Sequence, residues 1–484
     1  MLSKIKTLPS AIKSHFSKVE SKRYAAGKTS RSSGNWRPVD YGINELISQN
    51  GPEVRARVRQ LIRDFPPFSR AKRTITDFVV GPGIELQSRP VDKQGNYLPK
   101  LAAEIEDGYK RFCDEADIAG QLHGKEMERL ARDQETETGE YIIAQTNLKD
   151  AKRYIPMALQ MFEADWLTSY GAKAVGSNKI EQGVEYDSQT GRRAAFHFTD
   201  PDGIGKPRRI EARHIIHGFE TLRPGQFRGI SPFTPGVLVT RDLQDAMEGE
   251  IDGFKYAAKW LAIVKSMDPM GRQAALNDPN AETRAPIEEL ENGIIEYLRP
   301  NEDVHLMSNP RGAGNFEPFV HVVLLMISVA TGVPYELLSG DYRKLSWAVI
   351  RVVRSDFKQS LKPIATRHVR QNCDPIFREY LNQAVMSGRI HIPDYFSNPY
   401  QYNRAIWQPP VADPVDKLRD SKADIAEMES LLRSPQEIVA GRGRQLEDVM
   451  KELAAAKAMA EKYGLTMEEV STALANNPAA VAKD

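Results

Sequence analysis

Hydrophobic and polar positions are patterned most strongly between Phe316 and Ala384. An apolar block from Phe319 to Ala330 is followed by Gly332 and Pro334, the glycine cap and trailing proline that end many helices. The block is about half as long as the ~20 residues that cross a bilayer. We therefore predict a buried helix, in the core or at a helix–helix interface.

A second helical pattern begins near Leu345 and places its residues on two faces at a period near 3.6. The apolar face consists of Val349, Val353, Phe357, Leu361 and Ile364. The other face carries Arg343, Trp347, Arg351, Arg354, Lys358 and Lys362. Such a basic stripe suits a polyanion, but more often it is a solvated face or pairs with acidic residues of another subunit.

Residues 41–238 combine both periodicities and predict an α+β region with a largely antiparallel sheet. Helical patterns run from Tyr41 to Phe78 and again over residues 99–131. Predicted strands and extended segments follow one another as Ile84–Leu86, Gly139–Ala144, Ile155–Trp166, Val184–Tyr186 and Ala194–Phe198. The last two form a β-hairpin.

The rest of the chain is mostly helical. A long helix is predicted from Thr240 to Val264, acidic at its start and basic at its end, as the helix dipole favours. Residues 268–314 form an insertion rich in Pro, Asn, Gly and acidic residues, with a short strand at Gly293–Leu298. After a break at Trp407–Pro414, Ser434 and Glu437 form a capping box for further helices.

Composition limits the classes of function. At about 150 residues per domain, 484 residues predict several structural units. Lys+Arg number 66 against 65 for Asp+Glu, so any nucleic-acid affinity has to come from local patches. Cys113 and Cys373 lie far apart with no metal-ligand spacing, which fits a reducing compartment and argues against a zinc site. Two further candidates, His214 and His217, are expected on opposite faces of one strand, so we predict no metal there.

No segment predicts a secretory signal or a membrane span, so we expect a soluble protein made inside the cell. Residues 1–38 are basic and nearly free of acidic residues, as in an organelle transit peptide. The competing interpretation is a flexible basic arm that becomes ordered against a partner.

Catalytic motifs are missing from the sequence: there is no Walker A loop, no GxSxG, no HExxH and no paired-carboxylate motif. We therefore predict no catalytic residue, no cofactor and no metal, and a protein that is not an enzyme. An alternative is a DNA-processing or packaging enzyme subunit, a nuclease or motor, that holds DNA with the basic helix. Light scattering would show such a subunit as a small species.

Several short sequences occur in a characteristic order along the chain. They include Thr76–Ile84, the strand at Gly139–Glu140, Phe162–Asp165, Gly183–Asp187, Ile216–His217, Arg223–Ser231, Gly332–Tyr342 and the break at Trp407–Asp413. Together, over roughly residues 40–440, they resemble the lambda-type portal protein family of tailed bacteriophages. Arg343–Trp347 departs from the family pattern, because it is bulkier and more basic.

The resemblance implies a helix-rich, multi-domain α+β portal fold, and it favours the arm over the transit peptide. The implied segments are the arm (1–38), an α+β wing (39–238), a stem helix (239–266), a clip (267–314), a second stem helix (315–337), a tunnel loop (338–347), a long kinked helix that returns to the wing (348–412), and a helical crown with the C-terminal tail (413–484).

The resemblance also implies a ring, usually dodecameric, at one capsid vertex of the virion, with double-stranded DNA passing through its channel during packaging and ejection. The implied partners are the large terminase, a head–tail connector protein and the major capsid protein, with assembly in the host cytoplasm and no membrane. We expect Arg343, Lys344, Trp347 and Arg351 to face the DNA channel. We expect Leu324, Leu325, Arg354 and Lys358 at the subunit interface.

Overall fold

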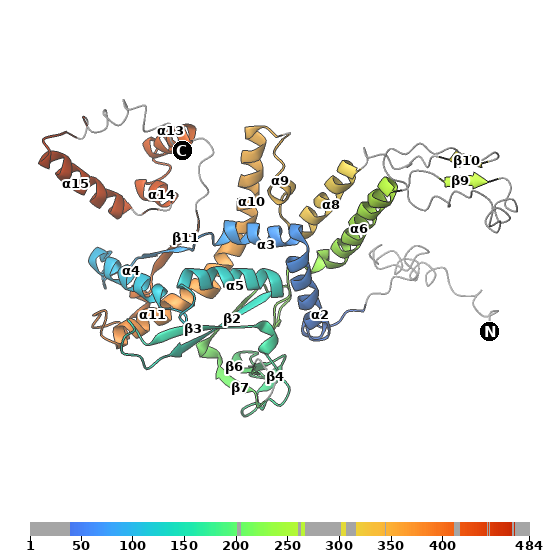
Figure 1. Ribbon diagram of the computed structural model, residues 1–484. Coiled ribbons are helices and arrows are strands. Elements are labelled where there is room, and N and C mark those ends of the chain that lie inside the picture. Colours follow the sequence, from blue (N-terminus) through green and yellow to red (C-terminus); the bar gives the residue numbers. More distant parts are fainter. Residues whose placement is uncertain are drawn as a thin grey trace, which may run out of the picture.

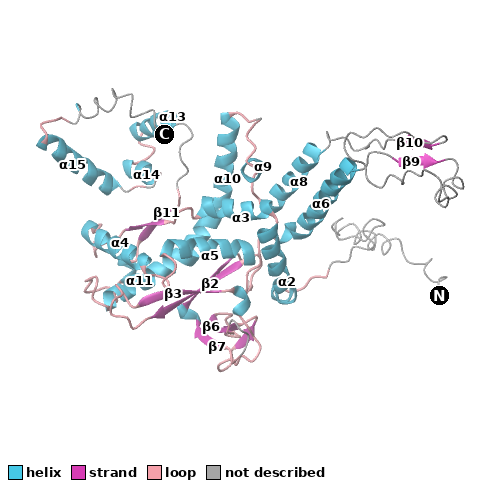
Figure 2. Ribbon diagram, viewed as in Figure 1, coloured by secondary structure: helices cyan, strands magenta, loops and turns pink. Residues whose placement is uncertain are grey.

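The computed structural model describes residues 39–200, 205–259, 263–266, 302–305, 316–343, 345–410, 417–442, 444, 446–466 and 469. The expected arm at 1–38 and the expected strand at Gly293–Leu298 lie outside the described residues, as does Lys344. Figures 1 and 2 show a body of helices and sheets from which a pair of helices, α6 and α8, projects.

Two helices open the described chain. They are α2 (Ile43–Asp64) and α3 (Pro66–Val79), and the second begins with prolines in its first turn, where the missing N–H costs nothing. The expected helix over 99–131 is two helices, α4 (Pro99–Asp114) and α5 (Gly124–Thr138). The expectation of one continuous helix is wrong because Asp117 builds a turn between them, accepting backbone N–H bonds from Ala119, Gln121 and Leu122.

The strands of the described residues pair antiparallel, and the largely antiparallel sheet expected for residues 41–238 is confirmed. A three-stranded sheet has the order β3-β2-β8, built from β2 (Glu140–Asn147), β3 (Met157–Phe162) and β8 (Ile215–Phe219). A four-stranded sheet runs β4-β5-β6-β7, built from β4 (Lys179–Glu181), β5 (Val184–Tyr186), β6 (Arg193–Phe198) and β7 (Arg208–Glu211). The hairpin predicted for β5 and β6 is therefore confirmed.

A third ladder joins the two ends of the body. In it β1 (Glu85–Ser88) pairs with β11 (Ala405–Gln408), so that Leu86 lies opposite Trp407. The sequence placed the start of a break at Trp407, which is wrong: the residue lies in a strand, and its indole N–H donates to Asp374. The break begins only after this strand, at Pro409 and Pro410, which have no N–H to offer a ladder.

The projecting helices are α6 (Val237–Lys259) and α8 (Phe316–Thr331). The expected helix to Val264 is too long, because α6 ends at Lys259 and Ile263–Ser266 forms β9. This strand pairs with β10 (Glu302–His305), and its β-branched residues suit a ladder. The end of the 239–266 stem segment is thus a strand.

The chain returns to the body through α9 (Tyr335–Ser339) and α10 (Trp347–His368). A π-helical turn, Val369–Cys373, connects α10 to α11 (Asp374–Met386). The final helices are α12 (Pro399–Tyr402), α13 (Lys417–Glu429), α14 (Pro435–Ala440) and α15 (Leu446–Lys462). The capping box predicted at Ser434 and Glu437 is confirmed in both of its hydrogen bonds.

Two large hydrophobic clusters hold the body together. One lies between α4, α5, α11 and the three-stranded sheet, around Ile105, Met157 and Phe377. The other lies where α2, α3, α8 and α10 meet, around Phe68 and Ile327. A smaller cluster joins the two main sheets.

Within one subunit, helix α8 is buried on one side, and the predicted burial in the core holds for that side. Val323 and Ile327 face the second cluster and are 1% and 0% exposed. The opposite side of the helix presents exposed apolar side chains, namely Val322, Leu325, Met326 and Val329. A hydrophobic sequence alone does not distinguish burial within a subunit from burial between subunits.

The loop that leads into α6 passes directly over the start of β2. A Cβ added to Gly229 would overlap the carbonyl oxygen of Gly139, and one added to Gly139 would overlap the backbone of Ile230. Gly139 also has a φ of +93°, which side chains rarely adopt. Both segments of the chain therefore need glycine where they cross, at positions 139 and 229.

We predict that Gly229→Ala destabilises the protein by roughly 1–3 kcal/mol, because backbone has to move to admit the methyl group. Thermal and urea unfolding monitored by circular dichroism measure the change. Gly42→Ala is the matched control, since nothing lies within 4 Å of its added Cβ. Equal stability of the two variants would contradict the close crossing.

Candidate functional site

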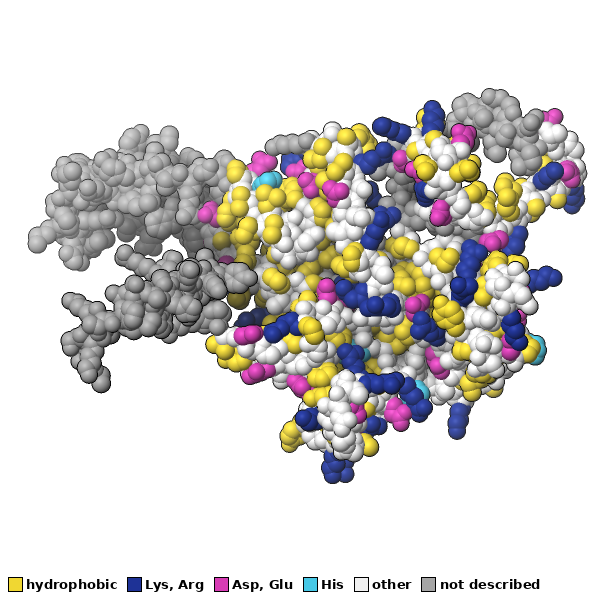
Figure 3. Space-filling view, turned by 180° about the vertical axis from the view of Figure 1, so that it is seen from behind, with side chains coloured by type: hydrophobic (Ala, Val, Ile, Leu, Met, Phe, Trp, Pro, Cys, Tyr) yellow, Lys and Arg dark blue, Asp and Glu magenta, His cyan; other side chains and the backbone are white. Residues whose placement is uncertain are grey.

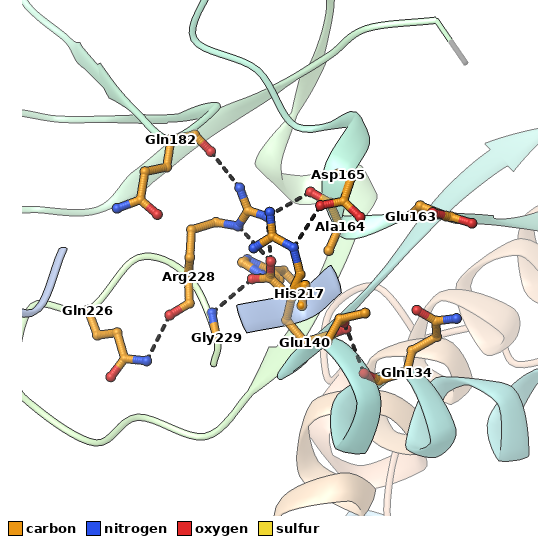
Figure 4. A network of polar contacts seen from close by, with 12 residues as sticks. Gln134, Glu140, Glu163, Ala164, Asp165, Gln182, His217, Gln226, Arg228 and Gly229 are labelled. Atoms are coloured by element: carbon orange, nitrogen blue, oxygen red, sulfur yellow. Dashed lines mark hydrogen bonds and ion pairs between the residues drawn. The ribbon is translucent and has the colours of Figure 1, made fainter. Parts of the chain in front are cut away.

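The crossing loop is fastened by a buried carboxylate, Glu140, at the first position of β2. Its side chain is fully buried, and Arg228 Nε donates to Oε1 at 2.7 Å. The other oxygen, Oε2, lies 2.9 Å from His217 Nε2 and accepts the Gly229 N–H at 2.8 Å. Figure 4 shows these groups converging on the carboxylate.

The charges in this network compensate one another. Burial opposes ionisation of Glu140, but Arg228 and the hydrogen bond from His217 outweigh it and hold its pKa well below the usual range. Burial lowers the pKa of His217 to about 4, so the ring is neutral near pH 7 and its Nε2–H donates to the carboxylate. Arg228 also donates from Nη1 to the carbonyl of Gln182 and from Nη2 to the carbonyl of Ala164.

The network extends to the N-terminal helix. Asp165 follows Ala164 and accepts a hydrogen bond from Arg55 Nε at 2.7 Å. It also forms an ion pair with Arg59, so that α2 is tied to the segment whose Ala164 carbonyl binds Arg228. Because α6 begins at Val237, shortly after the loop, this network anchors the segment from which α6 leaves the body.

A second buried carboxylate, Glu185 in β5, supports the four-stranded sheet. Its oxygens bind Arg209 Nε at 2.7 Å, His197 Nε2 at 3.0 Å and Asn178 Nδ2 at 2.7 Å. Burial opposes its ionisation, but the hydrogen bonds from Arg209, Asn178 and His197 outweigh burial and lower the pKa of Glu185 to about 2.

Of the residues expected to face DNA, Arg343 lies in the loop before α10, and Trp347 and Arg351 lie in its first two turns. Arg343 is exposed, yet its guanidinium binds Asp341 through Nε at 2.9 Å and Nη2 at 2.8 Å. These hydrogen bonds raise its pKa further above the usual range. Glu317 on α8 lies 4.0 Å from the same guanidinium. A polyanion that binds Arg343 therefore competes with carboxylates of its own chain.

Trp347 is the first residue of α10, where Ser346 caps the helix through its hydroxyl. Trp347 is 73% exposed, so its ring is accessible to a partner. Arg351, one turn on, is only half-exposed and binds Asp420 of α13 at 3.0 Å. The structure thus brings Arg343 and Trp347 to one exposed end, whereas Arg351 joins α10 to the C-terminal helices.

The residues expected at the subunit interface differ in exposure. Leu325 is 40% exposed on the outer side of α8, whereas Leu324 is partly buried against the second hydrophobic cluster. Arg354 lies over the ring of Phe78 at 6.0 Å, a cation–π contact within the subunit. Lys358 is half-buried, and burial and the neighbouring Lys362 lower its pKa.

A groove of about 530 Å³ separates α8 from the loop that carries Arg343. Its walls are Val320, His321, Leu324 and Tyr335, and charged groups of Glu317, Glu336, Asp341 and Arg343 lie at its edge. Figure 3 shows hydrophobic side chains gathered on the projecting helices beside the region drawn in grey. An apolar surface of this kind marks a protein–protein contact more often than a catalytic cleft.

Comparison with protein families identifies the chain. The model described as "Phage portal protein, lambda family" matches residues 29–364. The chain belongs to this family. The interpretation as a DNA-processing enzyme is therefore not favoured.

Two curated relatives agree with the assignment. A probable portal protein of Halomonas phage phiHAP-1 is 23% identical over 428 residues, which is 85% of this chain and 81% of the relative. Portal protein B of Escherichia phage lambda is 19% identical over 417 residues, 77% of this chain and 76% of the relative. Both matches span most of the portal chain.

Solved structures with a similar chain come from gene transfer agent particles. A chain of the native virion aligns with a TM-score of 0.48 at 13% identity, covering 84% of this chain and 95% of that one. A chain from the neck of the empty particle aligns with a TM-score of 0.46 at 14% identity, covering 84% and 95%. Within the described part of this portal chain, no helix has the length and apolar character needed to cross a bilayer.

Sequence reasoning missed the Glu140 network, although its members lie in the quoted motifs Gly139–Glu140, Ile216–His217 and Arg223–Ser231. A signal was present, because a glutamate at the start of an apolar strand needs a buried cation. The expectation that His214 and His217 share a strand is wrong: His214 ends a 3₁₀ turn and is exposed, and only His217 lies in β8.

We predict that acid destabilises the protein through these buried groups. Glu185 has a folded pKa near 2, below its ordinary value of 4.5, so its stabilisation is present above pH 4.5 and is lost as the pH falls towards 2. His217, with a folded pKa near 4, adds to the loss below pH 6.5 because protonation favours the unfolded chain. Thermal unfolding midpoints measured from pH 7 to pH 3 should fall steadily.

Glu185→Gln should lower the midpoint at pH 7 and flatten its decline between pH 4.5 and pH 3. Glu53→Gln, an exposed glutamate on α2, is the control and should keep the parental pH profile. A Glu185→Gln protein with the parental slope would mean that the buried carboxylate is not linked to acid stability.

Proposed function

We propose that the chain is the subunit of a portal ring, a dodecamer, set at one vertex of a phage capsid. Its central channel passes double-stranded DNA during packaging and ejection. Its partners are the large terminase, then the head–tail connector protein, and the major capsid protein around it. The ring assembles in the host cytoplasm and becomes part of the virion, where its role is structural and not enzymatic.

The observation that carries this proposal is the exposed apolar face of α8. Val322, Met326 and Val329 are 56%, 46% and 82% exposed, on a helix that projects from the body. Exposing large apolar groups to water is unfavourable. Covering them with a partner lowers the free energy by ~25 cal/mol for each Å² of apolar surface removed from water. Covering this face by neighbouring subunits around a ring removes the cost.

The segment boundaries of the portal fold follow the same proposal. The wing comprises the sheets and their helices, α6 and α8 form the stem, and β9 with β10 begins the clip. The loop after α9 is the tunnel loop, α10 with α11 is the long kinked helix, and α13 to α15 belong to the crown. The π-helical turn supplies the kink, since such turns interrupt the regular α-helical hydrogen bonds.

We assign residues to the channel or to the subunit interface from where they lie on α8, on α10 and in the loop before α10. Arg343, Lys344 and Trp347 face the channel, with Arg351 behind them, where only the first turn of α10 and the loop reach the axis. Leu324 and Leu325 pack at the subunit interface. Arg354 and Lys358 pair with acidic residues of neighbouring subunits, as half-buried cations at the edge of α10 would require.

We predict that Leu325→Asp abolishes ring formation and leaves a folded subunit. The carboxylate replaces an exposed apolar group, so it disturbs contacts between subunits more than those within one. Size-exclusion chromatography with light scattering should show a large ring for the parent and a small species for the variant, and circular dichroism should show retained helices.

Two variants make the comparison specific. Leu324→Asp introduces a charge against the second hydrophobic cluster, so it should also lower the unfolding temperature. Val175→Asp changes an aliphatic residue of the wing that is 57% exposed, against 40% for Leu325, and should form normal rings. Intact rings from Leu325→Asp would place this face outside the interface, and a parent that forms no ring would refute the proposed function itself.

We predict that Arg343→Gln/Lys344→Gln rings assemble normally but hold DNA less well. Each phosphate contact contributes a slope of about −0.9 in log affinity against log salt, so the loss should appear as a shallower salt dependence of DNA retention. Arg354→Gln/Lys358→Gln should instead weaken the ring.

Arg213→Gln/Lys206→Gln removes the same charge from the wing and is the control, because both residues are exposed near β7. Parental DNA retention by the loop variant, together with loss of DNA contact by intact Arg354→Gln/Lys358→Gln rings, would reverse the assignment of the two faces.

A further inference from the structure

The groove between α8 and the loop that carries Arg343 has the chemistry of a receptor for arginine side chains. On its wall the ring centroids of His321 and Tyr335 lie 4.6 Å apart. Glu317 lies one turn before His321 on α8 and lines the groove. Glu336 follows Tyr335 directly on α9 and lines it as well. Because a guanidinium group stacks on aromatic rings and binds carboxylates through paired N–H donors, this combination suits an arginine.

The groove carries more negative than positive charge. At its edge Asp341 and Arg343 form an ion pair, with 2.8 Å between Oδ2 and Nη2. Glu317 lies 4.0 Å from the same guanidinium, which Asp341 already occupies. Glu336 has no ion pair with any described residue. Once the Asp341–Arg343 pair is set aside, the carboxylates of Glu317 and Glu336 are left to attract cations.

A second hollow, of about 390 Å³, lies along α3 and is lined by arginines. Arg63 contributes from the end of α2, and Arg70 and Arg73 contribute from α3. Arg70, Arg73 and Asp77 follow at intervals of three or four residues, so they share one face of the helix. The opposite face of α3 is buried in the second hydrophobic cluster. The arginine face therefore points away from the core of the subunit.

Two of the charged groups around this hollow are already paired. Arg63 binds the carboxylate of Asp64 through hydrogen bonds of 2.8 and 3.1 Å. Asp77 forms an ion pair with Arg129 of α5. Each pair is neutral as a unit, so the positive charge of the hollow comes from its other arginines.

Those arginines are Arg70 and Arg73. Arg70 donates from Nε to the carbonyl of Leu337 at 3.1 Å, a hydrogen bond that leaves its positive charge uncompensated. Arg73 is exposed and has no ion pair with any residue that the structure describes. The chain thus presents two guanidinium groups on one surface and two carboxylates, of Glu317 and Glu336, in another.

The two surfaces cannot close on each other within one subunit. They are built on α3, α8 and α9, which pack on the second hydrophobic cluster and lie side by side (Figure 1). The hollows share no lining residue. In the described part of the chain, no ion pair joins the arginines of one to the carboxylates of the other. Complementary surfaces held apart on one chain indicate a contact between two chains.

We propose that the surface of α3 that carries Arg70 and Arg73 docks into the groove of the next subunit, where the arginines pair with Glu317 and Glu336. This inference rests on the ring of the proposed function. A closed ring of more than two copies needs a heterologous contact, in which two different patches of each chain meet. The arginine surface and the acidic groove supply two such patches with opposite charge.

Both surfaces adjoin residues that the proposed function assigns to the subunit interface. Leu324 lines the groove. Arg354 lies over the ring of Phe78, which directly follows Asp77 on α3. The arginine contact therefore extends the proposed interface and does not require a separate one.

Ion pairs at the edge of an interface select the partner more than they strengthen binding. Each exposed pair contributes little to the free energy of association, whereas like charges placed face to face are strongly unfavourable. A head-to-tail order of subunits brings arginine to carboxylate, and a head-to-head order brings arginine to arginine. The two surfaces therefore favour ring closure over other aggregates of the same chain.

Two charge-reversed, full-length proteins test the contact. Arg70→Glu/Arg73→Glu makes the α3 surface acidic, and Glu317→Arg/Glu336→Arg makes the groove basic. Alone, each protein has like charges at every contact, so half-maximal ring formation by light scattering should need at least about tenfold more protein. Mixed in equal amounts, the two proteins should form rings again. An alternating order restores opposite charge at every contact of an even-numbered ring, and native mass spectrometry should find equal numbers of each protein.

A matched control reverses charge elsewhere. Lys100→Glu/Lys110→Glu changes two exposed cations of α4 and should form rings at the parental concentration. Arg73→Glu alone is the mildest variant, because Arg73 has no ion pair within the described residues. Its deficit should shrink at high salt, which screens exposed charges. If a doubly reversed protein fails to fold, Arg73→Glu mixed with Glu336→Arg makes the same comparison.

Normal rings from each reversed protein alone would overturn this contact and leave the portal function standing. Folded variants that lose the ring and do not regain it on mixing would equally refute the pairing of these two surfaces. A parent that forms no ring would instead remove the proposed function on which the inference rests.

Discussion

The fold depends on one buried ion network, in which Glu140 at the start of β2 is held by Arg228 from the loop that leads into α6. A buried carboxylate without partners costs several kcal/mol, and here each oxygen has a charged or polar donor. The glycines at 139 and 229 let the two backbones approach closely enough for these bonds. Hydrogen bonds of this kind are directional, which hydrophobic contacts are not, and they anchor the loop from which α6 begins.

The sequence predicted individual helices and strands better than it predicted which of them pack or pair with one another. Periodicity located most helices and the β5–β6 hairpin, and Ser434 with Glu437 marked the start of a helix correctly, because these signals act within a few residues. The pairing of β1 with β11 was not predictable in this way, since Leu86 and Trp407 are distant in sequence and neither segment alternates long enough to demand a partner. The end of α6 was misplaced because the apolar residues near Ile263 suit a helix and a strand equally.

Candidate site residues were harder to place than elements, for a physical reason. The basic stripe on α10 is regular in sequence, but its members have different environments: Arg351 binds Asp420, Arg354 covers Phe78, and Arg343 folds back on Asp341. Periodicity gives the face of a helix that a residue occupies, whereas the neighbours on that face come from elsewhere in the chain. The quoted motifs around Glu140 and Arg228 turned out to be structural, because they build the junction and not a contact surface.

With Arg343 at the channel, as proposed above, its pairing with carboxylates of its own chain suits DNA that has to move. An unpaired arginine bound to phosphate in every subunit would hold a duplex tightly, because DNA offers a charge every ~1.7 Å along its axis. When Asp341 is 2.8 Å from the guanidinium and Glu317 is 4.0 Å away, phosphate replaces an existing ion pair, so the net gain from each contact is small. Phosphate and carboxylate are similar partners for the guanidinium, so the free energy of binding changes little as one phosphate leaves Arg343 and the next arrives. A ring of such residues would centre the duplex by repulsion and weak attraction together, and still let it slide.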